Sequence, residues 1–142
     1  MSGQAPRWTT SLQVRISAFA RCAWLWWLGV VVWAVVLFML SANSHPAAGP
    51  EIPHLDKILH ATYFAGGAFC LLMALLGRAG PWPWLRVMLT GLLFGAVVGA
   101  LDEWHQTFTP GRSGNDPGDW LADVTGSLLG AWVALKLMRR LG

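Results

Sequence analysis

The sequence predicts an all-α integral membrane protein, an antiparallel four-helix bundle with both termini in the cytoplasm. Of its 142 residues, 55% are hydrophobic and only 12% are charged. The apolar residues form long runs instead of alternating with polar ones, which is typical of membrane-spanning helices. Basic residues gather near one end of these runs and acidic residues near the other. This composition excludes an ordinary soluble domain, and the lack of a basic stripe with interleaved aromatic residues argues against a nucleic-acid partner.

The first apolar run extends from Cys22 to Ala42 without a charge. At 1.5 Å per residue, such a helix is about 31 Å long, enough to cross a hydrocarbon core of about 30 Å. Arginines precede the run and small residues follow it, as in a signal peptide, but its apolar region is too long for one. We therefore expect the helix to be retained, after a cytoplasmic segment over residues 1–21 and as the start of a membrane domain over residues 22–142.

Connections rich in Pro and Gly separate the remaining apolar runs from one another. The predicted helices are Leu55 to Gly77, Leu85 to Gln106 and Pro117 to Met138. The last of them has a recognisable start, with Asp116 as the N-cap and Pro117 as the first helical residue.

The distribution of charge predicts the orientation of these helices. One side of the membrane receives Arg7, Arg15, Arg21, Arg78, Arg86, Lys136, Arg139 and Arg140. The other side receives only two cations, Lys57 and Arg112. By the positive-inside rule the first side is cytoplasmic. The outer side then holds every acidic residue and every histidine: Glu51, Asp56, Asp102, Glu103, Asp116, Asp119, Asp123, His45, His54, His60 and His105.

Some of these polar residues should lie below the outer membrane interface. The uncharged runs Val87–Leu101 and Val124–Leu135 cover only about 22 Å and 18 Å as helices, less than the hydrocarbon core. Asp123 and Glu103 therefore lie inside the membrane region, and His60 should lie at a similar depth. Ionisable groups at such depths are costly and face a bundle interior, a cavity or one another.

Helical spacing places these residues on shared faces. Asp56 and His60 are four residues apart, Glu103 and Gln106 three apart, and Asp119 and Asp123 four apart, so that each pair lies on one side of its helix. The same faces continue as glycines that allow close helix approach: Gly91, Gly95, Gly99, Gly126 and Gly130. We expect the third and fourth helices to pack through these glycine seams, which open into an outer polar pocket.

The motifs Asp56-Lys57-x-x-His60-x-x-Tyr63, Glu103-x-x-Gln106-x-Phe108-x-Pro110-Gly111-Arg112 and Asp119-x-x-x-Asp123-x-x-Gly126-x-x-x-Gly130 occur in this order. Over roughly residues 30–140 the sequence thus resembles the VanZ-like membrane protein family. The resemblance implies an association with low-level resistance to the glycopeptide teicoplanin and a functional site at the motif positions, but no inherited catalytic residue. In that family the position of Asp123 is often Asn, and the loop from Arg112 to Asp119 is usually shorter.

The candidate ligand-binding residues are Asp56, Lys57, His60, Glu103, Gln106, Arg112, Asp119 and Asp123. Glu103 and His60 are also the candidate general acid or base. The alternative for Glu103 is a structural salt bridge with Lys57 or Arg112. Gln106 orients Glu103 or binds a substrate. Arg112 is either an internal counter-ion or a clamp for a phosphate or carboxylate. Asp116 either belongs to the site or only caps its helix.

Several polar and aromatic residues are expected outside the site. No motif fixes a ligand number for a metal, so neither metal nor cofactor is assigned. Cys22 and Cys70 read as inert thiols without CxxC spacing. Solvated or interfacial positions are expected for His45, His54, His105, Glu51 and Asp102. Belt or lipid-facing positions are expected for Trp8, Trp82, Trp84, Trp104 and Trp120.

Three functions follow as hypotheses. The first is a protein of the bacterial cytoplasmic membrane that binds an anionic lipid or lipid-linked envelope precursor at the outer leaflet, with a role in glycopeptide susceptibility or envelope stress. The second is an enzyme acting on a lipid-linked substrate, with Glu103 or His60 as acid or base and Arg112 stabilising charge. The third is a small proton- or cation-coupled transporter, which would need a route through the apolar inner half. Membrane lipids are the expected partners, and the oligomeric state is open.

Overall fold

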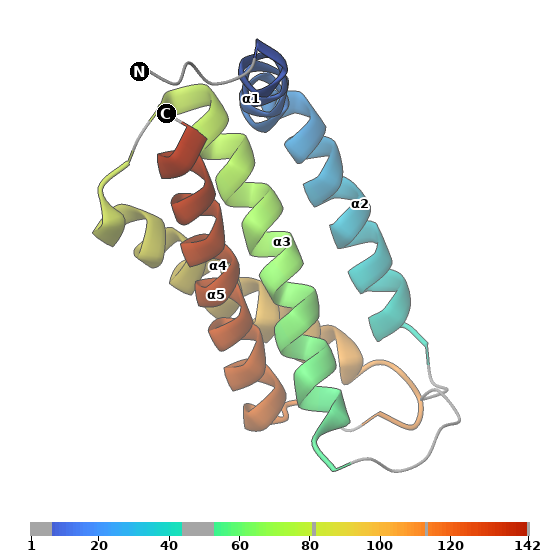
Figure 1. Ribbon diagram of the computed structural model, residues 1–142. Helices are drawn as coiled ribbons and strands as arrows, with labels where there is room; N and C mark the ends of the chain where they lie inside the picture. The colour runs from blue at the N-terminus through green and yellow to red at the C-terminus, as the bar shows by residue number, and fades with distance from the viewer. Residues whose placement is uncertain (1–6, 44–52, 81, 113, 142) are drawn as a thin grey trace.

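The computed structural model describes residues 7–43, 53–80, 82–112 and 114–141. These residues form five helices and no strand. They are α1 (Arg7–Ala20), α2 (Ala23–Ser41), α3 (Leu55–Ala79), α4 (Trp84–Gln106) and α5 (Pro117–Leu141). Of these, α2 to α5 are long and apolar enough to cross a membrane, and Figure 1 shows them running alternately up and down. The predicted all-α bundle of four spans is therefore confirmed.

The bundle has two chemically different ends. We call the acidic end the one where α2 and α4 finish and α3 and α5 begin, and the basic end the opposite one. The end of α5 and α1 lie at the basic end in Figure 1, while the end of α2 and the start of α3 lie at the acidic end. The sides of the membrane that these ends face stay a prediction, as does the division at residue 21.

Helix α1 occupies a segment for which the sequence predicted only a cytoplasmic position. It has no long apolar run, so its helical state did not stand out. The helix ends at Ala20, which is 3% exposed and belongs to the apolar core. Trp26 of α2 donates a hydrogen bond from Nε1 to the Ala20 carbonyl at 3.1 Å, and its ring meets Phe19 edge-on. These contacts tie α1 to the basic end of the bundle.

Glycines allow α3, α4 and α5 to pack closely against one another. On α4, a methyl group at Gly91 or Gly95 would meet Ser127 of α5, which explains why small residues are needed there. Gly126 and Gly130 of α5 instead lie against the carbonyl groups of α3. The glycine seam of α4 therefore faces α5, whereas the glycine seam of α5 faces α3. Helical spacing predicts which face of a helix carries small residues, but not which neighbouring helix that face contacts.

Helix α2 packs less deeply than the others. Its main anchor is Trp33, whose ring stacks on Tyr63 of α3. Trp33 Nε1 donates to the Tyr63 carbonyl at 2.9 Å, and the Tyr63 hydroxyl donates to the Trp33 carbonyl at 2.8 Å. Tyr63 thus joins the two helices. The rest of α2 exposes large apolar side chains, as expected for a helix that faces lipid.

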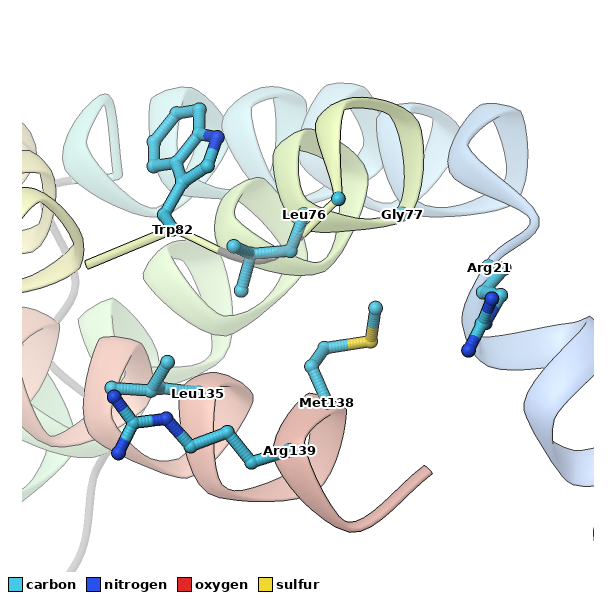
Figure 2. Close-up of a pocket in the computed structure, with 8 residues that line it drawn as sticks. Arg21, Leu76, Gly77, Trp82, Leu135, Met138 and Arg139 are labelled. Carbon is cyan, nitrogen blue, oxygen red and sulfur yellow. The ribbon is translucent and has the colours of Figure 1, made fainter. Parts of the chain in front are cut away.

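Toward the basic end the described core is apolar. Its fully buried members include Leu72 and Met73 of α3, Val87 of α4 and Ala131 and Ala134 of α5. A cavity of about 480 Å³ opens beside this core, between Arg21, Trp82, Met138 and Arg139. Figure 2 shows their side chains around it. This cavity lies at the end opposite to the predicted polar pocket.

Candidate functional site

The acidic end brings together polar side chains from the first turns of α3 and α5 and the last turns of α4. They form two adjoining groups. We call the first the lysine group; it consists of Lys57 with Asp56, Asp116 and Asp119. We call the second the histidine group; it consists of His60 with Asp102, Glu103, Gln106 and Asp123. Of the predicted ligand-binding residues, only Arg112 lies outside both groups.

The lysine group is a partly exposed ion-pair network. Lys57 Nζ lies 3.0 Å from Asp56 Oδ2, 3.0 Å from Asp116 Oδ2 and 2.8 Å from Asp119 Oδ1. An ammonium group has three protons to donate, so these three acceptors use them all. Lys57 therefore joins the start of α3 to the start of α5.

Asp116 has two roles in this network. Its Oδ1 accepts a hydrogen bond from the Gly118 backbone N–H at 2.7 Å, which makes it the predicted N-cap of α5. Its other oxygen binds Lys57. The hydrogen bond from Lys57, together with that from Gly118, lowers the pKa of the Asp116 carboxyl below its usual value. The residue thus caps the helix and also belongs to the cluster.

The histidine group contains an imidazole–carboxylate pair whose carboxylate is fully buried. His60 Nδ1 lies 2.9 Å from Asp123 Oδ1, and the Asp123 side chain has no exposed surface. An ionised carboxylate can only accept, so with Asp123 charged it is Nδ1 that carries the donated proton. Such a contact fixes the orientation of the ring and leaves Nε2 free to act. Nε2 lies 3.9 Å from Asp119 Oδ2, so the two groups adjoin.

Glu103 lies beside this pair and is only 4% exposed. Its Oε2 accepts a hydrogen bond from the Asp116 backbone N–H at 2.5 Å. Its Oε1 is buried and has no hydrogen-bond partner among the described residues, and the same is true of Asp123 Oδ2. Glu103 forms no ion pair with Lys57 or Arg112, each of which is described. The structural salt bridge considered for it is therefore not made.

Asp102 was expected to be solvated or interfacial, and that expectation is wrong. The residue is 5% exposed. Its Oδ2 accepts a hydrogen bond from Gln106 Nε2 at 2.8 Å, and its Oδ1 accepts one from the Ser41 hydroxyl at the end of α2. Gln106 therefore orients Asp102 and not Glu103. The signal was available in the spacing, because Asp102 and Gln106 are four residues apart on α4.

Arg112 lies at the same end of the molecule but points toward α2. Its guanidinium donates to the Leu40 carbonyl at 3.5 Å, in an exposed position. This distance is at the limit of a hydrogen bond, so the contact holds the side chain only weakly. Arg112 is therefore not the internal counter-ion of the described carboxylates, and it remains accessible at the surface.

The remaining polar and aromatic candidates lie around the site or away from it. His105 stacks on Phe38 at 4.6 Å between ring centroids, and His54 is exposed next to the start of α3. Trp104 is exposed, and Trp120 donates from Nε1 to the Ala96 carbonyl. Cys22 and Cys70 are free thiols. His45, Glu51 and the side chain of Trp8 lie outside the described residues.

Comparison with known proteins agrees with the motifs. The VanZ/LLP1 family model matches residues 14–139, which include both polar groups. The chain belongs to the VanZ/LLP1 family. With its four apolar spans it is a multi-pass membrane protein of that family. No curated protein and no solved structure gives a significant match to the chain.

Two sets of residues in this VanZ/LLP1 protein have the geometry of metal ligands. His60, Asp102 and Glu103 offer ligand atoms within 4.8 Å of one another, and so do Asp56, Asp116 and Asp119. In the second set the Lys57 ammonium already contacts all three carboxylates and occupies the place of a cation. The first set has no such cation, because no Lys or Arg of the described residues pairs with it.

Proposed function

We propose that this VanZ/LLP1 protein lies in the bacterial cytoplasmic membrane with its acidic end at the outer face. The Lys and Arg residues near the helix ends support this orientation, since most of them lie at the basic end and the positive-inside rule places that end in the cytoplasm. Both termini are then cytoplasmic, and the two polar groups lie near the outer leaflet, within reach of lipid head groups.

We further propose that the acidic end binds an anionic, phosphate- or carboxylate-bearing ligand of the cell envelope. Candidates are an anionic lipid or a lipid-linked precursor. The observation that carries this proposal is the buried Oε1 of Glu103, which has no partner among the residues that the structure describes. Buried polar atoms in native proteins nearly always have partners, so an orphaned one points to a group that binds there. A head-group hydroxyl or amine would supply the missing donor.

Arg112 supports the anionic character of this ligand. Its guanidinium is exposed and weakly held at 3.5 Å from the Leu40 carbonyl, so it can turn toward a bound phosphate with little loss. Lys57 is less suited to this role because three carboxylates already bind it. Binding an envelope lipid or precursor would alter how the cell surface meets teicoplanin-type antibiotics or other envelope stress.

A second candidate function is catalysis on a lipid-linked substrate, and the contact between His60 and Asp123 favours it. A buried carboxylate that binds one imidazole nitrogen orients the ring so that the other nitrogen can take a proton from a hydroxyl or water. Arg112 would then stabilise charge on a phosphate. Transport has less support, because the described core toward the basic end is apolar and closely packed.

Native mass spectrometry in nanodiscs of envelope lipids tests the binding proposal. We expect the wild-type protein to retain an anionic lipid that Glu103→Gln and Arg112→Ala both lose. Arg78→Ala, at the exposed basic end, is the matched control and should retain it. A changed mass of the retained lipid would favour catalysis. A folded wild type that retains no lipid would contradict the binding proposal.

Cells provide a second test. In a strain that depends on this protein, alanine at Glu103, Arg112 or His60 should change susceptibility to a glycopeptide antibiotic or another envelope stress. Unchanged responses at normal protein levels would contradict a role for the acidic end in the envelope.

A further inference from the structure

We propose that His60, Asp102 and Glu103 bind a divalent transition-metal cation, an inference that rests on the ligand site proposed above and names what holds the anion there. The cation would be of the Zn²⁺ or Mn²⁺ kind. One imidazole and two carboxylates suit these ions, whereas Ca²⁺ prefers six or more oxygen ligands.

The ligand atoms already lie close to the arrangement that a metal needs. The three side chains offer atoms within 4.8 Å of one another. Ligands that bind one cation at about 2.0–2.2 Å lie about 3.0–3.6 Å apart in a tetrahedral or octahedral site, so side-chain movements of about 1 Å would complete it. His60 comes from α3 and the two carboxylates from α4.

Glu103 provides the observation that points to a ligand. The residue is 4% exposed, and its Oε1 has no hydrogen-bond partner among the described residues. Its Oε2 is held by the Asp116 backbone N–H, so the carboxylate is oriented by one oxygen and free at the other. A bound cation would satisfy the free oxygen more completely than a neutral donor, because the carboxylate is buried and lacks an ion pair.

The surrounding contacts are those of outer-shell partners in metal sites. Asp123 binds His60 Nδ1 at 2.9 Å, which is the carboxylate–histidine arrangement that leaves Nε2 for the metal. Asp102 is oriented by Gln106 at 2.8 Å and by Ser41. Each Asp102 oxygen keeps a second lone pair for a cation. Each of the three candidate ligands thus has its own orienting contact.

Charge separates this site from the neighbouring lysine group. Asp56, Asp116 and Asp119 surround Lys57 Nζ, which already occupies the place of a cation. No Lys or Arg of the described part pairs with Asp102, Glu103 or Asp123. A divalent cation would offset most of the negative charge of these buried carboxylates, and its open positions could bind a phosphate or carboxylate oxygen of the ligand.

Mn²⁺ titration of the full-length protein in nanodiscs tests the inference after removal of metals with EDTA. We expect a single Mn²⁺ per chain by electron paramagnetic resonance, displaced by Zn²⁺ and not by excess Ca²⁺. Glu103→Gln should abolish binding, and Asp123→Asn should weaken it about 10- to 100-fold. A folded wild-type protein that binds neither Mn²⁺ nor Zn²⁺ overturns the inference, whatever the variants do.

Asp56→Asn locates the metal. It removes a carboxylate of the lysine group only, so Mn²⁺ binding should persist in this variant. If Asp56→Asn lost Mn²⁺ binding while Glu103→Gln retained it, the assignment would be overturned. If Glu103→Gln fails to fold, Asp102→Asn replaces it. Native mass spectrometry with and without EDTA separates the two proposals. Lipid retained equally in EDTA defeats the metal inference alone, whereas metal binding without any retained lipid defeats only the proposed function.

Discussion

The two ends of this bundle carry opposite charges, and these charges differ in burial. At the basic end the charged side chains are exposed, with Arg86 over the Trp82 ring and Lys136 near the Trp132 ring. At the acidic end Asp102, Glu103 and Asp123 are buried between helices. Long basic side chains can reach the membrane interface along an apolar stem, while short carboxylates at the same depth need partners inside the protein.

This difference supports the acidic end as the proposed functional site. Exposed Arg and Lys at helix ends are sufficiently explained as interfacial anchors. Buried carboxylates are costly, and the cost is offset only partly here, because one oxygen of Glu103 and one of Asp123 have no hydrogen-bond partner in the described part of the chain. Substitutions at the two ends should therefore have unequal effects on stability.

The largest effect is expected where α3 and α5 touch beneath the acidic groups. A side chain at Gly126 would overlap the Ala61 carbonyl group, which cannot move without breaking α3. Gly126→Val should destabilise the protein by about 3–5 kcal/mol or prevent folding, as measured by unfolding in mixed micelles. Gly66→Ala is the control, because nothing lies within 4 Å of the added methyl, and it should be neutral or slightly stabilising. Equal effects at both glycines would refute the close packing.

The next effect concerns the imidazole–carboxylate pair. Asp123→Leu removes the acceptor of His60 Nδ1 in a fully buried place, and we expect a loss of about 3 kcal/mol in unfolding free energy. Asp123→Asn keeps an acceptor oxygen and should cost about 1 kcal/mol. If the leucine variant were as stable as wild type, the pair would not contribute to holding α3 against α5.

Most of the fold followed from the sequence because membrane spans are set by run length. The four spans begin and end near their predicted residues, and the pairs spaced four apart, such as Asp119 and Asp123, do share a face. Helix α1 was not predicted from the sequence, because it lacks a long apolar run and is held by tertiary contacts such as that of Ala20. The helix that Gly126 packs against could not be predicted either, because helical periodicity shows which residues share a face and not which helix that face contacts.

The candidate site shows a similar limit. Depth arguments identified Glu103, His60 and Asp123, but Asp102 was expected to be solvated or interfacial. In the structure Asp102 reaches Ser41 of α2, whereas Glu103 reaches the backbone before α5. Two adjacent residues can both be buried when helices lie on two sides, and only the packing reveals this.

A smaller effect is expected in the lysine group, and it depends on pH. The pKa of Asp116 is lowered in the folded protein by Lys57. Its contribution to stability is therefore full above the ordinary carboxyl pKa and is lost as the pH falls through the lower, folded value. Lys57→Met should cost about 1 kcal/mol near neutral pH and should reduce the stability lost on acidification below about pH 4. Unfolding curves from pH 7 to 3 measure both, and parallel curves for the two proteins would contradict the assignment.

The smallest effect is expected at the basic end. Arg86→Gln removes the cation that lies 3.8 Å from the centroid of the Trp82 ring. The pair is exposed, so the loss should be about 0.5–1 kcal/mol in unfolding free energy. Lys136→Gln should cost still less, because its ammonium lies 5.6 Å from the Trp132 ring. Neither variant should alter lipid retention or Mn²⁺ binding at the acidic end. If Arg86→Gln destabilised the protein as much as Asp123→Leu, charge at the basic end would do more than anchor the helices, and the contrast between the two ends would fail.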